Sequence, residues 1–104
     1  MYVKINLLYF KGVKNMKTVV SVIGKDTVGI ISKVSAICAE CNANILDITQ
    51  SVLQDMFVMV MLTELKDSDC SFSNFSENMK ELGKVNNLDI RVMREDVFNS
   101  MHRI

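Results

Sequence analysis

The chain has 104 residues, of which 49% are apolar and 23% charged, with a mean hydropathy of +0.20 and a formal net charge of zero at pH 7. This length suits one compact domain, and the apolar content excludes intrinsic disorder. A neutral chain is also poorly suited to neutralising nucleic-acid phosphates. The longest apolar run, residues 56–62, has seven residues, whereas a membrane span needs about 20. We therefore expect neither a nucleic acid nor a membrane as a direct partner.

Residues 1–15 form a separate N-terminal extension in our interpretation. Lys4 and Asn6 interrupt its apolar residues, so it does not resemble a signal peptide. Residues 11–13 can be encoded by a purine-rich string like a bacterial ribosome-binding site, which suggests that translation begins at Met16. An added edge strand is the alternative, because residues 2–10 are compatible with β-structure. The odd number of cysteines, three, favours the reducing cytoplasm over a disulfide-stapled secreted scaffold.

The predicted elements begin with a β-branched strand at residues 18–23, followed by a loop at residues 24–29. Asp26 or Thr27 is the expected N-cap of the next helix, because a side-chain oxygen there can accept from amides of the first turn. Residues 42–44 are expected to end that helix. Its apolar residues recur at helical spacing along one stripe: Ile30, Ile31, Val34, Ile37, Cys38 and Cys41.

Two strands are predicted next, at residues 45–53 and 56–62, with a tight turn at Gln54 and Asp55 that makes them antiparallel neighbours. The first strand should place Leu46, Ile48 and Val52 on one face, and Asp47, Thr49 and Ser51 on the other. A second helix should follow, closed by Gly83 as a left-handed cap. Its apolar stripe is Phe72, Phe75, Met79 and Leu82. A last strand covers residues 88–93, and the tail, residues 96–104, adds a turn of helix.

The order of these elements is β-α-β-β-α-β. Each helix has one apolar stripe, so both should pack on the same face of a four-stranded antiparallel sheet. This predicts an α+β, ferredoxin-like sandwich, with the domain itself spanning residues 16–95.

Catalytic and metal-binding patterns are weak in this chain. The only histidine, His102, lies near the carboxyl end, and no Ser or Cys has a nearby His to activate it. Cys38 and Cys41 have the spacing of a redox or zinc pair, but they fall at the end of a helix and on its core-facing stripe. We expect them to pack as small apolar residues, and we expect no enzyme activity, metal or cofactor. A redox or metal role for this pair is retained as an alternative.

The loop at residues 24–29 joins a strand to a helix N-terminus, where amides and the helix dipole can hold a carboxylate. Asp26 could meet an ammonium group, Gly29 allows close approach, and Asn44 offers both a donor and an acceptor. Together these groups would suit a free amino acid. The simpler interpretation is that Asp26 only caps the helix and Asn44 only turns the chain.

The stretches Val22-Ile-Gly-Lys-Asp-Thr-Val-Gly-Ile30 and Asn44-Ile-Leu-Asp-Ile-Thr-Gln50 resemble the ACT domain, a regulatory βαββαβ module. The resemblance covers residues 16–95; it is closest to short stand-alone proteins of the UPF0237 type and extends to the glycine cleavage system transcriptional repressor. It implies an amino-acid ligand contacted by Asp26, Gly29 and Asn44. The full candidate site is Gly24, Lys25, Asp26, Thr27, Val28, Gly29, Ile30, Asn44 and Ile45. Val28 departs from the family, which commonly has Pro there, so the loop loses a fixed φ.

The resemblance also implies a homodimer with ligand at its interface. An open sheet face bearing Val58 and Val60 independently needs cover. We therefore expect a cytoplasmic, non-enzymatic sensor or regulatory subunit that acts on a metabolic enzyme. A protein-interaction module with no ligand is the second hypothesis.

Overall fold

The computed structural model describes residues 15–25, 28–66 and 70–101. Their elements are β1 (Asn15–Lys25), α2 (Ile30–Glu40), β2 (Asn44–Leu53), β3 (Met56–Lys66), α3 (Phe72–Asn86), β4 (Asp89–Arg94) and α4 (Glu95–Met101). The strands form one antiparallel sheet in the order β2-β3-β1-β4. This confirms the predicted ferredoxin-like fold. The proposed start at Met16 stays a prediction, because residues 1–14 lie outside the described ranges.

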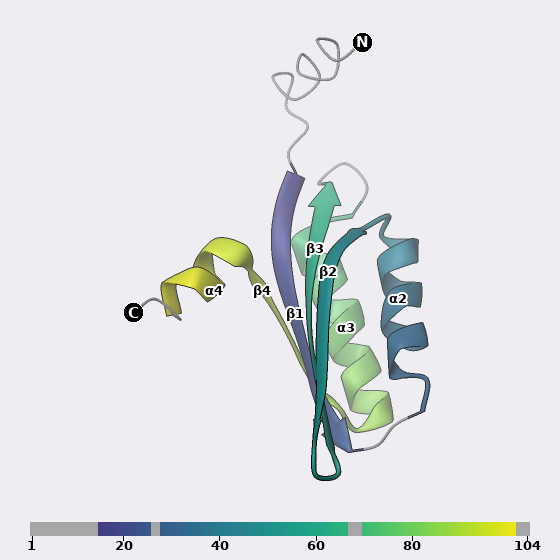
Figure 1. The fold of residues 1–104 in the computed structure, drawn as a ribbon. Coiled ribbons are helices and arrows are strands. Elements are labelled where there is room, and N and C mark those ends of the chain that lie inside the picture. The colour runs from purple at the N-terminus through teal and green to yellow at the C-terminus, as the bar shows by residue number, and fades with distance from the viewer. Residues whose placement is uncertain (1–14, 26–27, 67–69, 102–104) are drawn as a thin grey trace, which may run out of the picture.

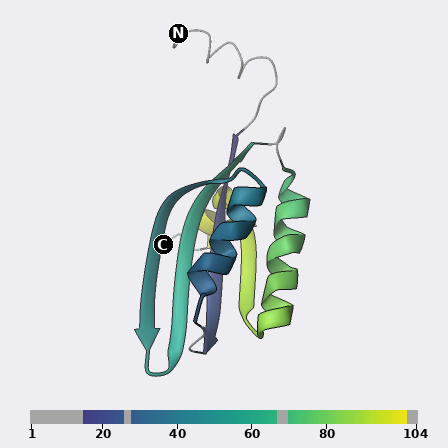
Figure 2. The ribbon, with the colours of Figure 1, turned by 90° about the vertical axis from the view of Figure 1, so that its right-hand side faces the viewer.

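Helices α2 and α3 lie side by side on one face of the sheet, and α4 lies on the other (Figures 1 and 2). The face toward α2 and α3 carries the core, as the two predicted helical stripes require. Its fully buried side chains come from both central strands and both helices: Val20, Val22, Met59, Met61, Leu65, Val34, Cys38, Phe75 and Met79. These apolar side chains pack together from strand to helix.

One buried polar pair interrupts the apolar core. Thr18 of β1 and Thr63 of β3 are register partners, and neither is exposed. Their hydroxyl groups hydrogen-bond to each other, and the Thr63 hydroxyl also lies 3.5 Å from the Thr18 carbonyl oxygen. Each buried hydroxyl therefore has a partner, which offsets the cost of removing it from water.

Strand β2 forms one edge of the sheet, and its register differs from the alternation that we predicted. Leu46 has no partner on β3, because the pairing shifts between Ile45 and Asp47. This bulge places Ile48 and Val52 opposite the core-facing Met61 and Phe57. The prediction that Ile48 and Val52 share a face is confirmed, whereas the prediction that Leu46 lies in the same alternation was wrong. Both Ile48 and Val52 remain exposed, at 37% and 67%.

Helix α3 continues one turn beyond Gly83, so the prediction that Gly83 caps it was wrong. The left-handed cap is Asn87, with φ of +57°, while the Leu88 amide donates to the Gly83 carbonyl oxygen at 2.8 Å. Gly83 is buried inside the helix against β4. A Cβ added there would lie 2.7 Å from the Leu88 carbonyl oxygen. Glycine serves close helix–strand packing at this position and not helix termination.

The face of the sheet opposite α2 and α3 is only partly covered. Helix α4 contacts β1 and β4 on this side, where Val19 is buried. Toward the β2–β3 hairpin the face stays open. Exposed apolar side chains there include Ile23, Leu53, Met56 and Val60.

Candidate functional site

Five of the predicted site residues lie at the end of the sheet where β1 leads into α2. Gly24 and Lys25 are the last residues of β1, Val28 and Gly29 form the turn, and Ile30 begins α2. Val28 is 92% exposed and Ile30 only 4%. Asp26 and Thr27, between them, lie outside the described residues.

The N-cap of α2 is Gly29, so the prediction of Asp26 or Thr27 at that position was wrong. Gly29 has a left-handed φ of +84°, and its carbonyl oxygen accepts the first helical hydrogen bond, from the Lys33 amide at 3.0 Å. A Cβ added at Gly29 would have no neighbour within 4 Å, so glycine is required here by conformation and not by crowding. Because glycine has no side chain, the N-cap residue itself satisfies none of the first-turn amides.

A shallow hollow of about 440 Å³ lies at this first turn of α2. It is lined by Gly29, Ile30, Ile31 and Ser32 from the helix entrance and by Phe57 from β3. The positive end of the helix dipole points toward this region, which favours an anion of carboxylate size. The apolar side chains offer contact for a small aliphatic group.

A second hollow, of about 700 Å³, lies at the end of β1. Gly24 and Lys25 contribute to it together with residues from the end of α3 and the start of β4, among them Lys84 and Asp89. Lys25 also forms an exposed ion pair with Asp55 at 3.8 Å. Among the described residues of the predicted loop, Gly24 and Lys25 thus line one hollow, and Gly29 lines the other.

Asn44 and Ile45 lie at the opposite end of the sheet. Gly24 pairs with Phe57 of β3, whereas Asn44 pairs with Glu64, seven residues further along the same strand. At roughly 3.3 Å per residue, this separates Asn44 from the loop by about 23 Å within one chain. The structure thus divides the predicted site into two parts.

The corner that leads to Asn44 is tightly closed by backbone hydrogen bonds. Asn42 takes a left-handed φ of +57°, and the Ala43 amide donates to the Cys38 carbonyl oxygen at 2.8 Å. The predicted end of the helix at residues 42–44 is confirmed. Asn44 is exposed, while Ile45 packs against the core. Asn44 is therefore an exposed residue at the start of the edge strand β2.

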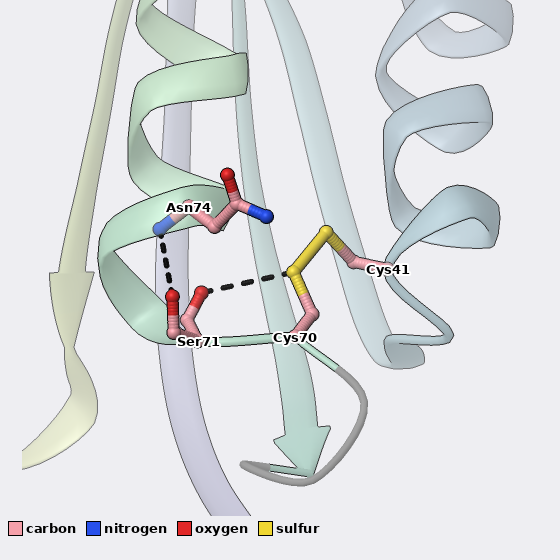
Figure 3. Close-up of a disulfide and its surroundings, with 4 residues drawn as sticks. All are labelled: Cys41, Cys70, Ser71 and Asn74. Atoms are coloured by element: carbon pink, nitrogen blue, oxygen red, sulfur yellow. Dashed lines mark hydrogen bonds between the residues drawn. A yellow bond between two sulfur atoms is a disulfide. The ribbon is translucent and has the colours of Figure 1, made fainter.

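A disulfide at this corner was not predicted. Cys41, the C-cap residue of α2, is bonded to Cys70, whose Cα lies 5.1 Å away just before the N-cap of α3. Figure 3 shows the bond joining the two helix ends. The expectation that Cys41 packs as a free thiol, and the alternative that it pairs with Cys38, are both wrong. The βαββαβ topology held the missed signal, because it runs the two helices antiparallel and brings the end of one to the start of the other.

Cys38 faces the core one turn earlier, as predicted. It is 1% exposed, and its Sγ lies 3.9 Å from the Met61 Sδ. Burial raises the pKa of the Cys38 thiol to about 11. At neutral pH this thiol is protonated and chemically quiet.

The described residues contain no group of three or more His, Cys, Asp or Glu side chains arranged to hold a metal ion. Within the same ranges, no helix has the length and apolar character needed to cross a membrane.

Comparison with known proteins identifies the class. A family model of the ACT domain matches residues 17–93. A UPF0237 protein of Clostridium perfringens is 49% identical over 89 residues, which cover 86% of this chain and all of that protein. The chain therefore belongs to the UPF0237 family of ACT-domain proteins.

Solved structures agree with this assignment. An ACT domain protein from Streptococcus pneumoniae is 32% identical, with a TM-score of 0.69 over 80% of this chain and 93% of that one. A putative glycine cleavage system transcriptional repressor has a TM-score of 0.70 at 21% identity. That comparison covers 77% of this chain and 46% of the repressor, and at this identity it supports the shared fold alone.

Proposed function

We propose that this protein is a non-enzymatic regulatory protein of the cytoplasm, which binds a small amino acid between two copies of the chain. The observation that carries the proposal is the division of the candidate site. The α2 entrance and Asn44 lie about 23 Å apart along β3, at roughly 3.3 Å per residue. A free amino acid is too short to touch both parts in one chain.

A two-fold dimer through the β2 edge would bring the two parts together. When two copies of β2 run antiparallel, the start of one strand lies beside the end of the other. Val52, the last residue but one of β2, pairs with Phe57, which also lines the hollow at the α2 entrance. Asn44 of one copy would then approach the helix entrance of its partner.

The two edges of the sheet differ in a way that favours β2 for pairing. β4 has six residues, including Asp89, Arg91 and Arg94, and leads directly into α4. β2 has ten residues, no Lys or Pro, and exposed Ile48 and Val52 side chains. Beyond the bulge and the charged Asp47 near its start, the rest of this long edge has no charged or proline residue that would block another strand.

In this dimer, the amino-acid carboxylate would bind at the amides of the α2 first turn. Asp26 would meet the ammonium group, and the Asn44 side chain of the partner would complete the site with a donor and an acceptor. A ligand held by both copies stabilises one arrangement of the dimer over others. Ligand concentration would thereby control contact with a regulated metabolic enzyme.

A mixing experiment tests both ligand binding and assembly of the site from two chains. The twenty amino acids are first screened at millimolar concentration by thermal shift, where a ligand at a hundred times its Kd adds about 2.7 kcal/mol of stability. Asp26→Ala and Asn44→Ala are each expected to abolish the shift. When the two variants are unfolded together and refolded as mixed dimers, one of the two sites in each mixed dimer is intact, and binding should return.

The possible outcomes separate the hypotheses. No shift with any amino acid would favour the interaction module without ligand. Loss of binding in both variants without recovery in the mixture would contradict the two-chain site. Ile48→Lys should weaken the dimer in sedimentation experiments, whereas Val85→Lys, at a residue 72% exposed on α3, serves as the matched control.

A further inference from the structure

The bond between Cys41 and Cys70 closes the corner at which α2 ends and α3 begins (Figure 3). We propose that Cys41 and Cys70 form a reversible thiol–disulfide pair that exchanges with low-molecular-weight disulfides, while Cys38 takes no part. The exchange chemistry of this pair requires no bound amino acid. In the cytoplasm, where we place the protein, disulfides are chiefly transient or redox-sensing.

The position of Cys70 favours exchange chemistry. It stands immediately before Ser71, whose Oγ accepts from the Asn74 amide at 3.1 Å and caps the 15-residue helix α3. The positive end of this helix stabilises a thiolate on Cys70, which is the reactive form. When protonated, the Cys70 thiol can donate to the Ser71 carbonyl oxygen, 3.7 Å from its Sγ. The reduced Cys70 thiol therefore has a hydrogen-bond acceptor at the corner.

Access to the pair requires a small local opening. Cys41 and Cys70 are 4% and 6% exposed. Both lie at helix ends next to the surface-exposed Asn42 and Ser71, where local opening needs less energy than unfolding of the core. Cys38, in contrast, lies within α2 and contacts Met61 of the central strand β3. The geometry thus distinguishes two exchangeable sulfurs from one inert sulfur.

Oxidation proceeds by two exchange steps. The thiolate of one cysteine attacks a sulfur of a glutathione-type disulfide, forming a mixed disulfide as the original S–S bond breaks and one small thiolate leaves. The thiolate of the other cysteine attacks the protein-bound sulfur, forming the Cys41–Cys70 bond and releasing the second small thiol. The protein loses two electrons, the small disulfide gains them, and the two cysteine protons end on the two released thiols.

The consequence of oxidation falls on Asn44. This residue lies three positions after Cys41, and the bond ties the turn before it to the start of α3. Oxidation should therefore hold residues 42–44 more firmly, and reduction should allow this turn to open more often.

Redox titration of the full chain tests the pair directly. The protein is equilibrated without oxygen in glutathione buffers from fully reduced to fully oxidised, quenched with acid and labelled with a maleimide in denaturant. We expect the number of labelled thiols to fall from three to one in a single two-electron step, with Cys38 carrying the remaining label. In the Cys38→Ala variant, the number of labelled thiols should fall from two to zero, at a glutathione buffer ratio within about twofold of that of the wild type.

Several results would overturn the proposal: three labels in every buffer, one label in every buffer, a lasting glutathione adduct on one cysteine, or a disulfide that includes Cys38. Peptide mapping of the wild-type chain distinguishes these without any variant. Amide hydrogen exchange at residues 42–44 should be slower in the oxidised form by at least threefold. Equal exchange in both forms would contradict the effect on the corner.

Discussion

Gly83 of α3 lies directly against the backbone of Leu88, so closely that a Cβ at residue 83 would stand 2.7 Å from the Leu88 carbonyl oxygen. The same added atom would lie 3.3 Å from the Ile90 side chain. The backbones at residues 83 and 88 cannot easily move apart, because the Leu88 amide donates to the Gly83 carbonyl oxygen. This contact sets how closely α3 packs against the sheet.

Gly83→Ala should consequently destabilise the protein by about 1–3 kcal/mol through overpacking. Helix propensity by itself predicts the opposite, a gain of up to about 1 kcal/mol. Urea unfolding of the wild type and of Gly83→Ala shows whether the substitution lowers or raises the free energy of unfolding. Lys84→Ala, at the next and exposed position, is the control and should change stability by less than about 0.5 kcal/mol. A stabilised Gly83→Ala variant would show that α3 can shift away from β4.

Gly29→Ala should cost about 1–2 kcal/mol, because alanine must adopt the φ of +84° observed at this N-cap. Gly29→Asn should cost less, since asparagine tolerates the left-handed region better and its side chain can cap a helix. Thermal unfolding of the two variants compares these costs. Equal stability of both variants with the wild type would mean that the turn adopts another conformation.

The Cys41–Cys70 bond should stabilise the folded chain by about 3–4 kcal/mol relative to the dithiol form. The sequence separation of 29 residues sets this value, because the bond reduces the conformational entropy of the unfolded chain. Urea unfolding with and without a reductant measures the difference. Cys70→Ser should match the reduced wild type and lose its response to reductant, whereas Cys38→Ala should keep that response.

Alkaline pH should weaken the fold through Cys38. Its pKa is raised from 9.0 to about 11 by burial, so the folded chain retains a proton that the unfolded chain releases. The contribution of the protonated Cys38 thiol to the free energy of unfolding is therefore fully present below pH 9. It is lost as pH rises through 11, up to about 2–3 kcal/mol in total. The difference between wild type and Cys38→Ala isolates it from other titrating groups. Parallel stability curves from pH 8 to 11 would contradict the assignment.

The elements and their order were predictable because they depend on local patterns. The strand at residues 18–23 is a local β-branched run, and the stripe from Ile30 to Cys38 has local helical spacing. The turn at Gln54 and Asp55 is a pair of polar residues between two strands. The ends of the helices were harder to predict. Gly83 resembled a helix cap, but its contact with Leu88, five residues later, determines its role. Asp26 resembled an N-cap, but Gly29 adopts that position.

The candidate site was predicted as a single group of residues, and the structure changes that view. Gly29 and Asn44 are close enough in sequence to suggest one pocket, yet α2 and the turn after it lie between them, and the helix alone is about 16 Å long for 11 residues at 1.5 Å each. The helix predicted from the sequence already places these residues at its opposite ends, which the grouping into one site overlooked. The pairing of β1 and β2 with β3 fixes the same separation across the sheet.

From its sequence alone, this protein is determined as one βαββαβ domain with an apolar core on the helix side of the sheet, since the spacing of apolar residues specifies which face each element buries. Tertiary structure decided three things that depend on contacts between distant segments. It joined Cys41 to Cys70, left the β2 edge exposed, and separated Asn44 from the entrance of α2. Such relationships arise from how the elements pack against each other in space, and the spacing of apolar residues within each element does not predict them.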